Sequence, residues 1–306
     1  MTVRHFTELS DLGPEGLLRV LDAADRWQAS RGLPDAPRPL AGKSVALIFE
    51  KASTRTRLSL EVAVVELGGH PIVISTEGSQ LGRGEPMADT ARVLSRMVHG
   101  ITVRTFEHTR LLELARESRV PVLNALTDQS HPMQLLADLQ VVRRAKKRLK
   151  ELSYAWIGDG NNMANSWIEA AGLLGLQLTL ACPRGYGPDE RELERARKRG
   201  ARLRVVQDAK QAAAGADVIS TDVFTSMGQE RERVERLQAF AGMCVNQEVL
   251  AAAAPEAMVL HCLPAHRGEE ISADVIDGPQ SHVWDQAEAR LHTAKAALEW
   301  ALTPDA

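Results

Sequence analysis

The chain has 306 residues, of which 44% are hydrophobic and 25% charged, a balance typical of a globular protein long enough for two domains. The formal net charge of -3 excludes a global positive field that would draw the protein to nucleic acid or anionic lipid. No apolar run approaches the roughly 20 residues that cross a bilayer, so we expect no membrane partner.

The N-terminal segment and the cysteines indicate the compartment. The first fifteen residues lack the apolar core of a signal peptide, and they carry three acidic residues, which a transit peptide would avoid. Cys182, Cys244 and Cys262 form no CxxC pair and leave an odd count, which favours reduced thiols over a disulfide framework. We therefore expect a cytoplasmic protein.

Apolar strand-like runs alternate with helix-length segments in the first half of the chain, which is typical of a parallel sheet covered by helices. The apolar run Ser44–Phe49 predicts a strand, and a helix follows from about residue 55 to 67, closed by Gly68 and Gly69. Further short strands are predicted at 72–74, 101–104 and 120–123, and further helices at 89–97 and 109–117.

A second alternating series begins after residue 150. Its strands are predicted at 154–157, 177–181, 203–206, 218–220 and 258–261, with helices at 188–199 and 229–240. A last helix, about 287–302, lies beyond the final strand, so we expect it to pack on the first domain. We therefore predict an α/β fold of two domains, each a parallel sheet flanked by helices, with the C-terminal helix returning to the first domain. The predicted boundaries are 1–145 plus 287–306 for the first domain and 146–286 for the second.

The basic stretch Arg143–Lys150 has two interpretations, a nucleic-acid patch or the solvated end of a connecting helix. The rest of the chain is slightly acidic, which favours the solvated helix end. We therefore expect no nucleic-acid partner.

The segment Phe49–Arg57 carries the strongest chemical signal, because it follows a predicted strand and opens a predicted helix. The unpaired N–H groups and the dipole of a helix N-terminus favour an anion, and a guanidinium suits phosphate oxygens. The side chains gathered at this tip are Ser53, Thr54, Arg55 and Thr56. An ordinary Ser/Thr N-cap is the alternative, but three hydroxyls and two arginines in five residues exceed what a cap needs.

Two other polar side chains lie near predicted strand ends in the same domain. Arg104 ends the run Ile-Thr-Val-Arg, and His131 opens the segment His-Pro-Met-Gln just before a helix. Alone, each would more often be a salt-bridge partner or a capping histidine. Ligands of open α/β sheets bind outside the carboxyl ends of the strands, so the shared location favours one anion site.

The glycines Gly158 and Gly160 follow a strand and invite a dinucleotide-binding interpretation. Met163 replaces the third glycine of that motif, and no acidic residue ends the next strand to hold a ribose. The sequence therefore disfavours a nicotinamide-dependent dehydrogenase. Asn162 is better interpreted as an amide that faces a polar substrate.

Five separated segments, in the same order, resemble the aspartate/ornithine carbamoyltransferase family. They are Ser53–Arg57, Gln80–Pro86, His131–Gln134, Asp222–Gly228 and His261–Gly268. The resemblance runs from about residue 5 to 300. Within the family, the last two segments are similar to members that act on ornithine, although Phe224 stands where a tryptophan is common.

The resemblance implies that the first domain binds carbamoyl phosphate and that no metal or other cofactor is needed. The phosphate would be held by Ser53, Thr54, Arg55 and Thr56 with help from Arg104, and Arg290 would stabilise the departing phosphate. The family also forms homotrimers with shared active sites, in which Gln80 would come from a neighbouring subunit.

The carbamoyl group would be bound by a second set of residues, again by resemblance. His131, Arg104 and Thr56 would donate to the carbamoyl oxygen, which gains negative charge in the tetrahedral intermediate. Gln134 and the backbone carbonyl of Leu263 would orient the carbamoyl NH₂. The remaining contacts would come from Pro132, Met133 and Cys262.

The second substrate would be L-ornithine, whose side-chain amine must be neutral to attack. Asp222 and Cys262 would help that amine lose its proton, although a buried cysteine is more often inert packing. The α-amino and α-carboxylate groups would be held by Asn162, Ser226 and Met227. His261 and His266 suggest a metal near Cys262, but the spacing fits no structural zinc pattern.

Two other functions stay open on the sequence. The first is the same chemistry on another amine, such as an acylated ornithine, putrescine or aspartate. The second is a non-catalytic protein that binds carbamoyl phosphate. The presence of Arg55, His131, Asp222, Cys262 and Arg290 together favours an enzyme, because a sensor could lose the residues that handle the amine.

Overall fold

The computed structural model describes residues 3–51, 53–75, 84–226 and 230–303. Contacts within the chain divide it into two compact units, residues 1–140 with 288–306, and residues 141–287. The two boundaries fall inside helices α5 (Pro132–Lys146) and α12 (Val283–Leu302).

The first unit is built on a parallel sheet in the order β2-β1-β3-β4. Its strands are β1 (Ser44–Phe49), β2 (His70–Ser75), β3 (Gly100–Arg104) and β4 (Val122–Leu126). The central strands β1 and β3 are almost wholly buried, as expected where helices cover both faces of a parallel sheet. Phe49 pairs with Arg104, so β1 and β3 end side by side.

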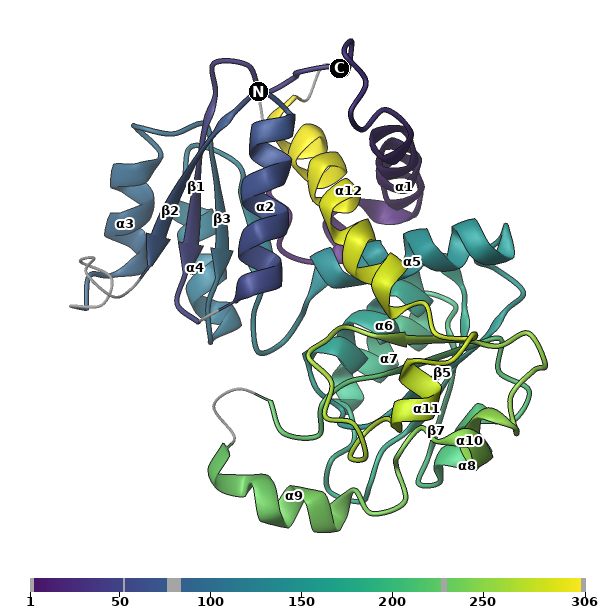
Figure 1. The fold of residues 1–306 in the computed structure, drawn as a ribbon. Coiled ribbons are helices and arrows are strands. Elements are labelled where there is room, and N and C mark those ends of the chain that lie inside the picture. Colours follow the sequence, from purple (N-terminus) through teal and green to yellow (C-terminus); the bar gives the residue numbers. More distant parts are fainter. Residues whose placement is uncertain (1–2, 52, 76–83, 227–229, 304–306) are drawn as a thin grey trace. The chain divides into compact units, whose positions relative to one another are not determined.

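Helices surround this sheet, and α12 is one of them. The others are the short η1 (Leu9–Asp11), α1 (Gly13–Ala29), α2 (Thr54–Glu66), α3 (Met87–Leu94), α4 (His108–Glu117) and the first part of α5. Trp27 Nε1 donates to Glu299 Oε2 of α12 at 2.8 Å, and Lys43 Nζ donates to the Leu302 carbonyl at 2.6 Å. Figure 1 shows α12 (yellow) between α1 and α2. The predicted return of the C-terminal helix to the first domain is therefore confirmed.

The second unit holds a five-stranded parallel sheet in the order β7-β6-β5-β8-β9. Its strands are β5 (Ser153–Ile157), β6 (Gln177–Ala181), β7 (Arg202–Val206), β8 (Val218–Thr221) and β9 (Met258–His261). Its helices are α6 (Asn162–Leu174), α7 (Glu190–Lys198), α8 (Ala209–Ala213), η3 (Glu230–Glu232), α9 (Arg233–Ala239), α10 (Gln247–Leu250) and α11 (Ala273–Ile276). The predicted α/β class, with two parallel sheets flanked by helices, is thus confirmed.

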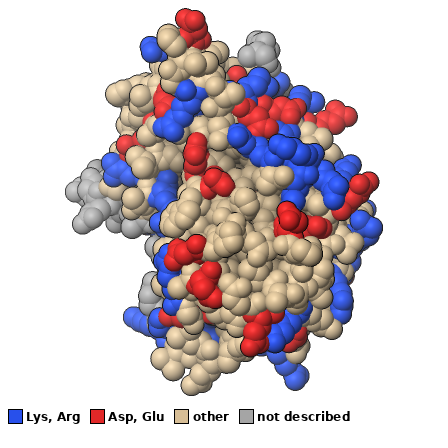
Figure 2. Space-filling view, turned by 45° about the vertical axis from the view of Figure 1, so that its right-hand side comes forward, with Lys and Arg blue, Asp and Glu red and all other residues tan. Residues whose placement is uncertain are grey.

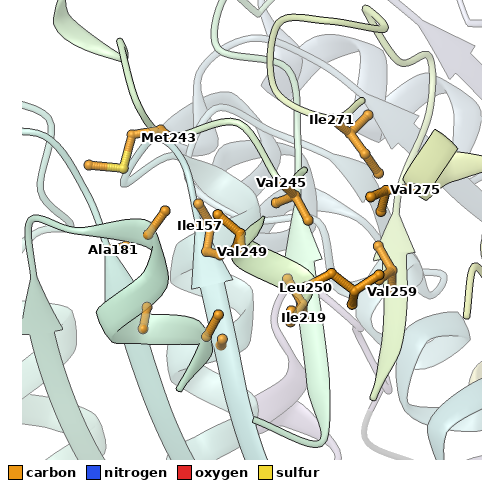
Figure 3. Close-up of a cluster of buried hydrophobic side chains, with 14 of the residues drawn as sticks. Ile157, Ala181, Ile219, Met243, Val245, Val249, Leu250, Val259, Ile271 and Val275 are labelled. Atoms are coloured by element: carbon orange, nitrogen blue, oxygen red, sulfur yellow. The ribbon is translucent and has the colours of Figure 1, made fainter. Parts of the chain in front are cut away.

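One face of this second sheet packs on a single apolar cluster. Figure 3 shows Ile157, Ile219 and Val259, from three neighbouring strands, pointing toward Val249 and Val275 of the short helices α10 and α11. These side chains are all β-branched and compact, so the short helices can pack closely against the sheet.

Most predicted elements agree with the structure within a few residues, but the short helices α8, α10 and α11 were not predicted, and two longer helices also differ. Helix α12 begins four residues earlier than the predicted start at 287. Helix α1 is absent from the elements predicted above, because Gly13 and Pro14 at its start are typical of a turn and no side chain caps it. Among the described residues, no helix is both long and apolar enough to span a bilayer.

Substitution of Ile219 by Ala tests the apolar cluster. Ile219 is fully buried in the second sheet, so we expect the free energy of unfolding to fall by about 2–5 kcal/mol in urea denaturation. Val205→Ala is the control, because Val205 lies 41% exposed on the edge strand β7 and should change stability by less than about 0.5 kcal/mol. Equal losses in both variants would contradict the assignment of the core.

Candidate active site

The order of the strands marks one position in each sheet where a ligand is expected. In the order β2-β1-β3-β4 the connections diverge between β1 and β3, and in β7-β6-β5-β8-β9 they diverge between β5 and β8. Crevices form outside the carboxyl ends of strands at such switch points. The predicted residues 53–56 and Arg104 lie at the ends of β1 and β3, and Asn162 and Asp222 follow β5 and β8. His131 follows β4 instead, and Cys262 follows β9.

Three side chains meet at the switch point of the first unit. Arg104, at the end of β3, donates from Nη1 to Thr56 Oγ1 at 3.2 Å. Arg290, on α12, donates from Nη2 to the same hydroxyl at 2.6 Å. All three side chains are buried. Two guanidinium cations held this close repel each other, so an anion bound between them would stabilise the arrangement.

The N-terminus of α2 supplies the remaining predicted phosphate ligands. Ser53 is the N-cap residue, yet its side chain makes no capping hydrogen bond with any described residue. Thr54 and Arg55 are exposed at the same tip. The ordinary capping interpretation therefore does not account for Ser53, and the N–H groups of the first turn of α2 remain available to an anion.

His131 is the residue before α5 and is almost completely buried. Burial, together with the cations Arg290 and Arg104, holds the pKa of its imidazole well below the usual range. His131 is therefore neutral at pH 7, and a neutral imidazole carries a single N–H donor. Pro132 begins α5 and Met133 follows it, both buried beside His131.

Gln134 presents an acceptor. Its Nε2 donates to Asp138 Oδ1 at 2.9 Å, one turn further along α5. The carboxylate accepts hydrogen bonds, so this contact fixes which end of the amide is NH₂. Gln134 Oε1 is buried without a hydrogen-bond partner among the described residues. A bound group with an N–H would satisfy it.

Asp222 and Cys262 come together at the switch point of the second unit. They follow β8 and β9, and the Cys262 Sγ–H donates to Asp222 Oδ1 at 2.9 Å. Asn161 lies nearby, with Nδ2 3.4 Å from Asp222 Oδ2. Asn162 begins α6 half-buried beside it, and Ser226 is half-buried in the loop after β8.

The turn after β9 is held by His261. The Leu263 N–H donates to His261 Nδ1 at 2.9 Å, and His261 Nε2 lies 3.0 Å from Glu270 Oε1. Leu263 has a positive φ of 58°, which a leucine adopts only where its surroundings hold it. The Leu263–Pro264 peptide is cis. The contacts of His261 thus hold the backbone at Leu263 in this conformation.

A metal ion would have to break this arrangement. Asp222, His261 and Cys262 each offer a ligand atom, all within 4.8 Å of one another. Both ring nitrogens of His261 are already engaged, one as the acceptor for Leu263 and the other toward Glu270. His261 could bind a metal only by losing one of these bonds.

Gly160 has a packing role that explains the glycine-rich loop without a dinucleotide. A Cβ at Gly160 would lie 2.3 Å from the Gly187 carbonyl carbon and the Pro188 nitrogen. The Gly160 N–H also donates to the Tyr186 carbonyl at 2.8 Å. Backbone therefore passes directly over Gly160, and no larger residue fits.

Arg236, on α9, is a buried residue of this region that the sequence did not reveal. Its guanidinium pairs with Asp159 and donates from Nε to the Phe224 carbonyl at 2.6 Å. It lies over the rings of Tyr186 and Phe240, at 4.9 and 5.5 Å from their centroids. Arg236 thus joins the loops after β5 and β8. Its sequence surroundings, a run of charged residues, are typical of a solvated helix.

Two predicted site residues, Gln80 and Met227, lie outside the described residues. The basic residues of 143–150 are half-buried or exposed at the end of α5 and beyond it. Figure 2 shows basic and acidic side chains next to one another over the face drawn.

Comparisons with known proteins agree across both units. A family model described as the carbamoyl-P binding domain of aspartate/ornithine carbamoyltransferase matches residues 4–144, and a second, described as its Asp/Orn binding domain, matches 150–301. Over 98% of the chain and 97% of the relative, the identity is 54% to an ornithine carbamoyltransferase of Acidothermus cellulolyticus. The identity to the ornithine carbamoyltransferase of Geobacter metallireducens is 51%, over 96% of this chain and 98% of the relative.

Solved structures give the same result. The ornithine carbamoyltransferase of Pyrococcus furiosus matches with a TM-score of 0.92 and 43% identity over 98% of each chain. An anabolic ornithine carbamoyltransferase of Campylobacter jejuni matches with a TM-score of 0.93 and 36% identity, over 99% of this chain and 100% of that one.

Substitution of Gly160 by Ala tests the close backbone approach. The added Cβ must displace the 187–188 backbone, so we expect the free energy of unfolding to fall by about 1–3 kcal/mol. Gly187→Ala is the matched control, because a Cβ there meets nothing within 4 Å. Urea denaturation of both variants decides the point, and equal stability would show that the loop opens without cost.

Proposed function

Because the chain belongs to the aspartate/ornithine carbamoyltransferase family, we propose that it transfers the carbamoyl group of carbamoyl phosphate to the side-chain amine of L-ornithine, giving L-citrulline and phosphate. The observation that carries this proposal is the convergence of Arg104 and Arg290 on Thr56 beside the N-terminus of α2. Residues 1–145 with 287–306 would bind carbamoyl phosphate and 146–286 would bind ornithine. No metal or other cofactor takes part in the proposed reaction.

Carbamoyl phosphate would bind with its phosphate at the start of α2. Ser53, Thr54 and Thr56 would donate from hydroxyls, and Arg55 would approach from the exposed side. Arg104 and Arg290 would neutralise the charge that grows on the phosphate as the C–O bond breaks. The 13-residue α2 adds its N–H groups and dipole to the same anion.

The carbamoyl group would be held by His131 and Gln134. A neutral His131 donates one hydrogen bond to the carbamoyl oxygen, and this bond strengthens as the oxygen becomes negative. The buried Oε1 of Gln134 and the Leu263 carbonyl would accept from the carbamoyl NH₂. Pro132, Met133 and Cys262 would supply the rest of the binding surface.

The amine of ornithine attacks only with its lone pair. The pKa of an aliphatic amine is about 10.4, so at pH 7 most ornithine side chains are protonated. Each must lose a proton to a nearby acceptor before it can attack. The contact between Cys262 and Asp222 supports a role for both beside that amine. Asn162, Ser226 and Met227 would hold the α-amino and α-carboxylate groups. Attack forms the N–C bond of the tetrahedral intermediate, and its collapse breaks the C–O bond while the departing phosphate takes the second proton of the amine.

We further propose a cytoplasmic homotrimer with shared active sites. Cys182, Cys244 and Cys262 are all thiols, which fits a reducing compartment. On one face of helix α2, Leu58 is 61% and Val65 58% exposed among the described residues. The helix packs on the edge strand β2. We propose that a neighbouring subunit covers this exposed apolar face.

Replacement of Arg55 by Gln tests the phosphate site. Loss of a charge-assisted hydrogen bond costs about 1.5–3 kcal/mol, so we expect the KM for carbamoyl phosphate to rise about 10- to 100-fold. The matched control is Arg57→Gln, because Arg57 lies two residues on and pairs with Glu61 at 2.5 Å. Steady-state assays of citrulline formation measure both. An unchanged KM for Arg55→Gln would remove this residue from the site.

A mixing experiment tests the shared site. At a carbamoyl phosphate concentration far below the raised KM, Arg55→Gln and Gln80→Ala chains are each expected to be nearly inactive alone. After denaturation and joint refolding in equal amounts, a site is intact only where its own chain keeps Arg55 and the neighbour keeps Gln80. Random assembly of a closed ring gives this at about one site in four, so activity should recover to about a quarter of wild type. A mixture no more active than the average of its two components would contradict a shared site.

A further inference from the structure

Helices α2 and α12 meet at two points in the first unit. Arg290 of α12 reaches Thr56 in the first turn of α2. Lys295 of α12 forms an ion pair with Glu66 in the last turn of α2. Figure 1 shows the two helices side by side. One contact is thus at the proposed phosphate site and the other is at the opposite end of the same helix.

The second contact lies in a closely packed place. The Lys295 side chain is only 3% exposed, and its Nζ lies 5.7 Å from the centre of the Trp27 ring. Glu66 also accepts from Arg31 Nε at 3.3 Å. Burial opposes the charge on Glu66, but Lys295 and Arg31 outweigh it and hold the pKa of this carboxyl below its usual value. Glu66 is therefore ionised at neutral pH and holds both cations.

A buried lysine is a costly way to join two helices. Lys295 loses nearly all of its hydration while Glu66 stays 29% exposed, and the desolvation of the lysine offsets much of the attraction within the pair. An ion pair differs from apolar packing in fixing one rotation and one axial position. The Glu66–Lys295 pair is therefore better suited to setting the register of α2 against α12 than to stabilising their contact.

That register decides where Arg290 lies. Thr56 and Glu66 are separated by about 15 Å along α2, and Arg290 and Lys295 by about 7.5 Å along α12, at 1.5 Å per residue. Two contacts so far apart prevent the helices from sliding or rotating past each other. Arg104 reaches Thr56 from β3 and does not depend on this register.

We propose that Glu66 and Lys295 are positioning residues that hold Arg290 against Thr56 and so set the affinity of the phosphate site. This inference rests on the proposed function for its effect on catalysis, but its effect on anion binding does not require carbamoyl transfer. Displacement of a substrate-holding group by even about 1 Å is enough to change rates severalfold to a hundredfold.

Lys295→Met and Glu66→Gln test the inference with nearly unchanged side-chain volume. In Lys295→Met, Glu66 keeps Arg31 as a partner, so its carboxylate is not left alone. We expect the Kd for inorganic phosphate, from calorimetry, to rise about tenfold in both variants, the size of coupling found between contacting side chains. The kcat/KM for carbamoyl phosphate should fall by a similar factor, with the KM for ornithine unchanged.

Lys43→Met is the matched control. Lys43 also binds α12, through the Leu302 carbonyl at the end of the helix far from Arg290, and its loss should leave the phosphate Kd within about twofold of wild type. In an Arg290→Gln background, Lys295→Met should add less than about a twofold change, because the residue it positions is gone.

Each outcome decides the inference. A lower melting temperature with an unchanged phosphate Kd would reduce the pair to a structural role. An equal rise in Kd in the Arg290→Gln background would show that the pair acts by another route. If the wild-type protein binds phosphate in this pattern but forms no citrulline, the inference stands and the proposed function fails.

Discussion

The first unit depends on one electrostatic constraint, the placing of two buried guanidinium groups on a single hydroxyl. Arg104 lies at the end of β3, and Arg290 lies on α12, almost two hundred residues further along the chain. Both donate to Thr56. Water cannot screen their repulsion well at a buried position. The chain must therefore hold α2, β3 and α12 in fixed relation, and the ion pair between Glu66 of α2 and Lys295 of α12 joins the two helices. An anion at this point removes the repulsion, so binding and folding favour the same geometry.

Each of the two sheets has a switch point at which its connections diverge. In both sheets, polar side chains gather at the ends of the two strands between which the connections diverge, β1 and β3 in the first unit and β5 and β8 in the second. The first unit adds His131 after β4. Parallel strands bring their carboxyl ends to one edge, so residues far apart in sequence gather without special loops. The second unit adds β9, whose end places Cys262 against Asp222. A fold of this kind can change its chemistry by changing a few residues at strand ends while the sheets stay as they are.

Local patterns predicted much of this and long-range contacts the rest. Buried runs such as Ser44–Phe49 identify strands because a covered parallel strand is apolar throughout. The helix after Ser53 and the residues at its tip were also predictable, since caps and turns are local. Arg236 was not, because its burial depends on Asp159 and Tyr186, which come from distant segments of the chain. The tautomer of His261 and the orientation of Gln134 likewise follow from partners that no spacing in the sequence reveals.

The orientation of Gln134 has a consequence for selectivity among acyl phosphates. Asp138 holds the NH₂ end of the amide, so the other end presents only a lone pair. Under the proposed function, acetyl phosphate would fill the same volume with a methyl group in place of the carbamoyl NH₂. A methyl group leaves that buried oxygen unsatisfied, and a site built to accept a hydrogen bond rejects an analogue that cannot donate one far more strongly than shape alone allows. Two residues one helical turn apart would thereby keep a common metabolic acyl donor from acylating the amine.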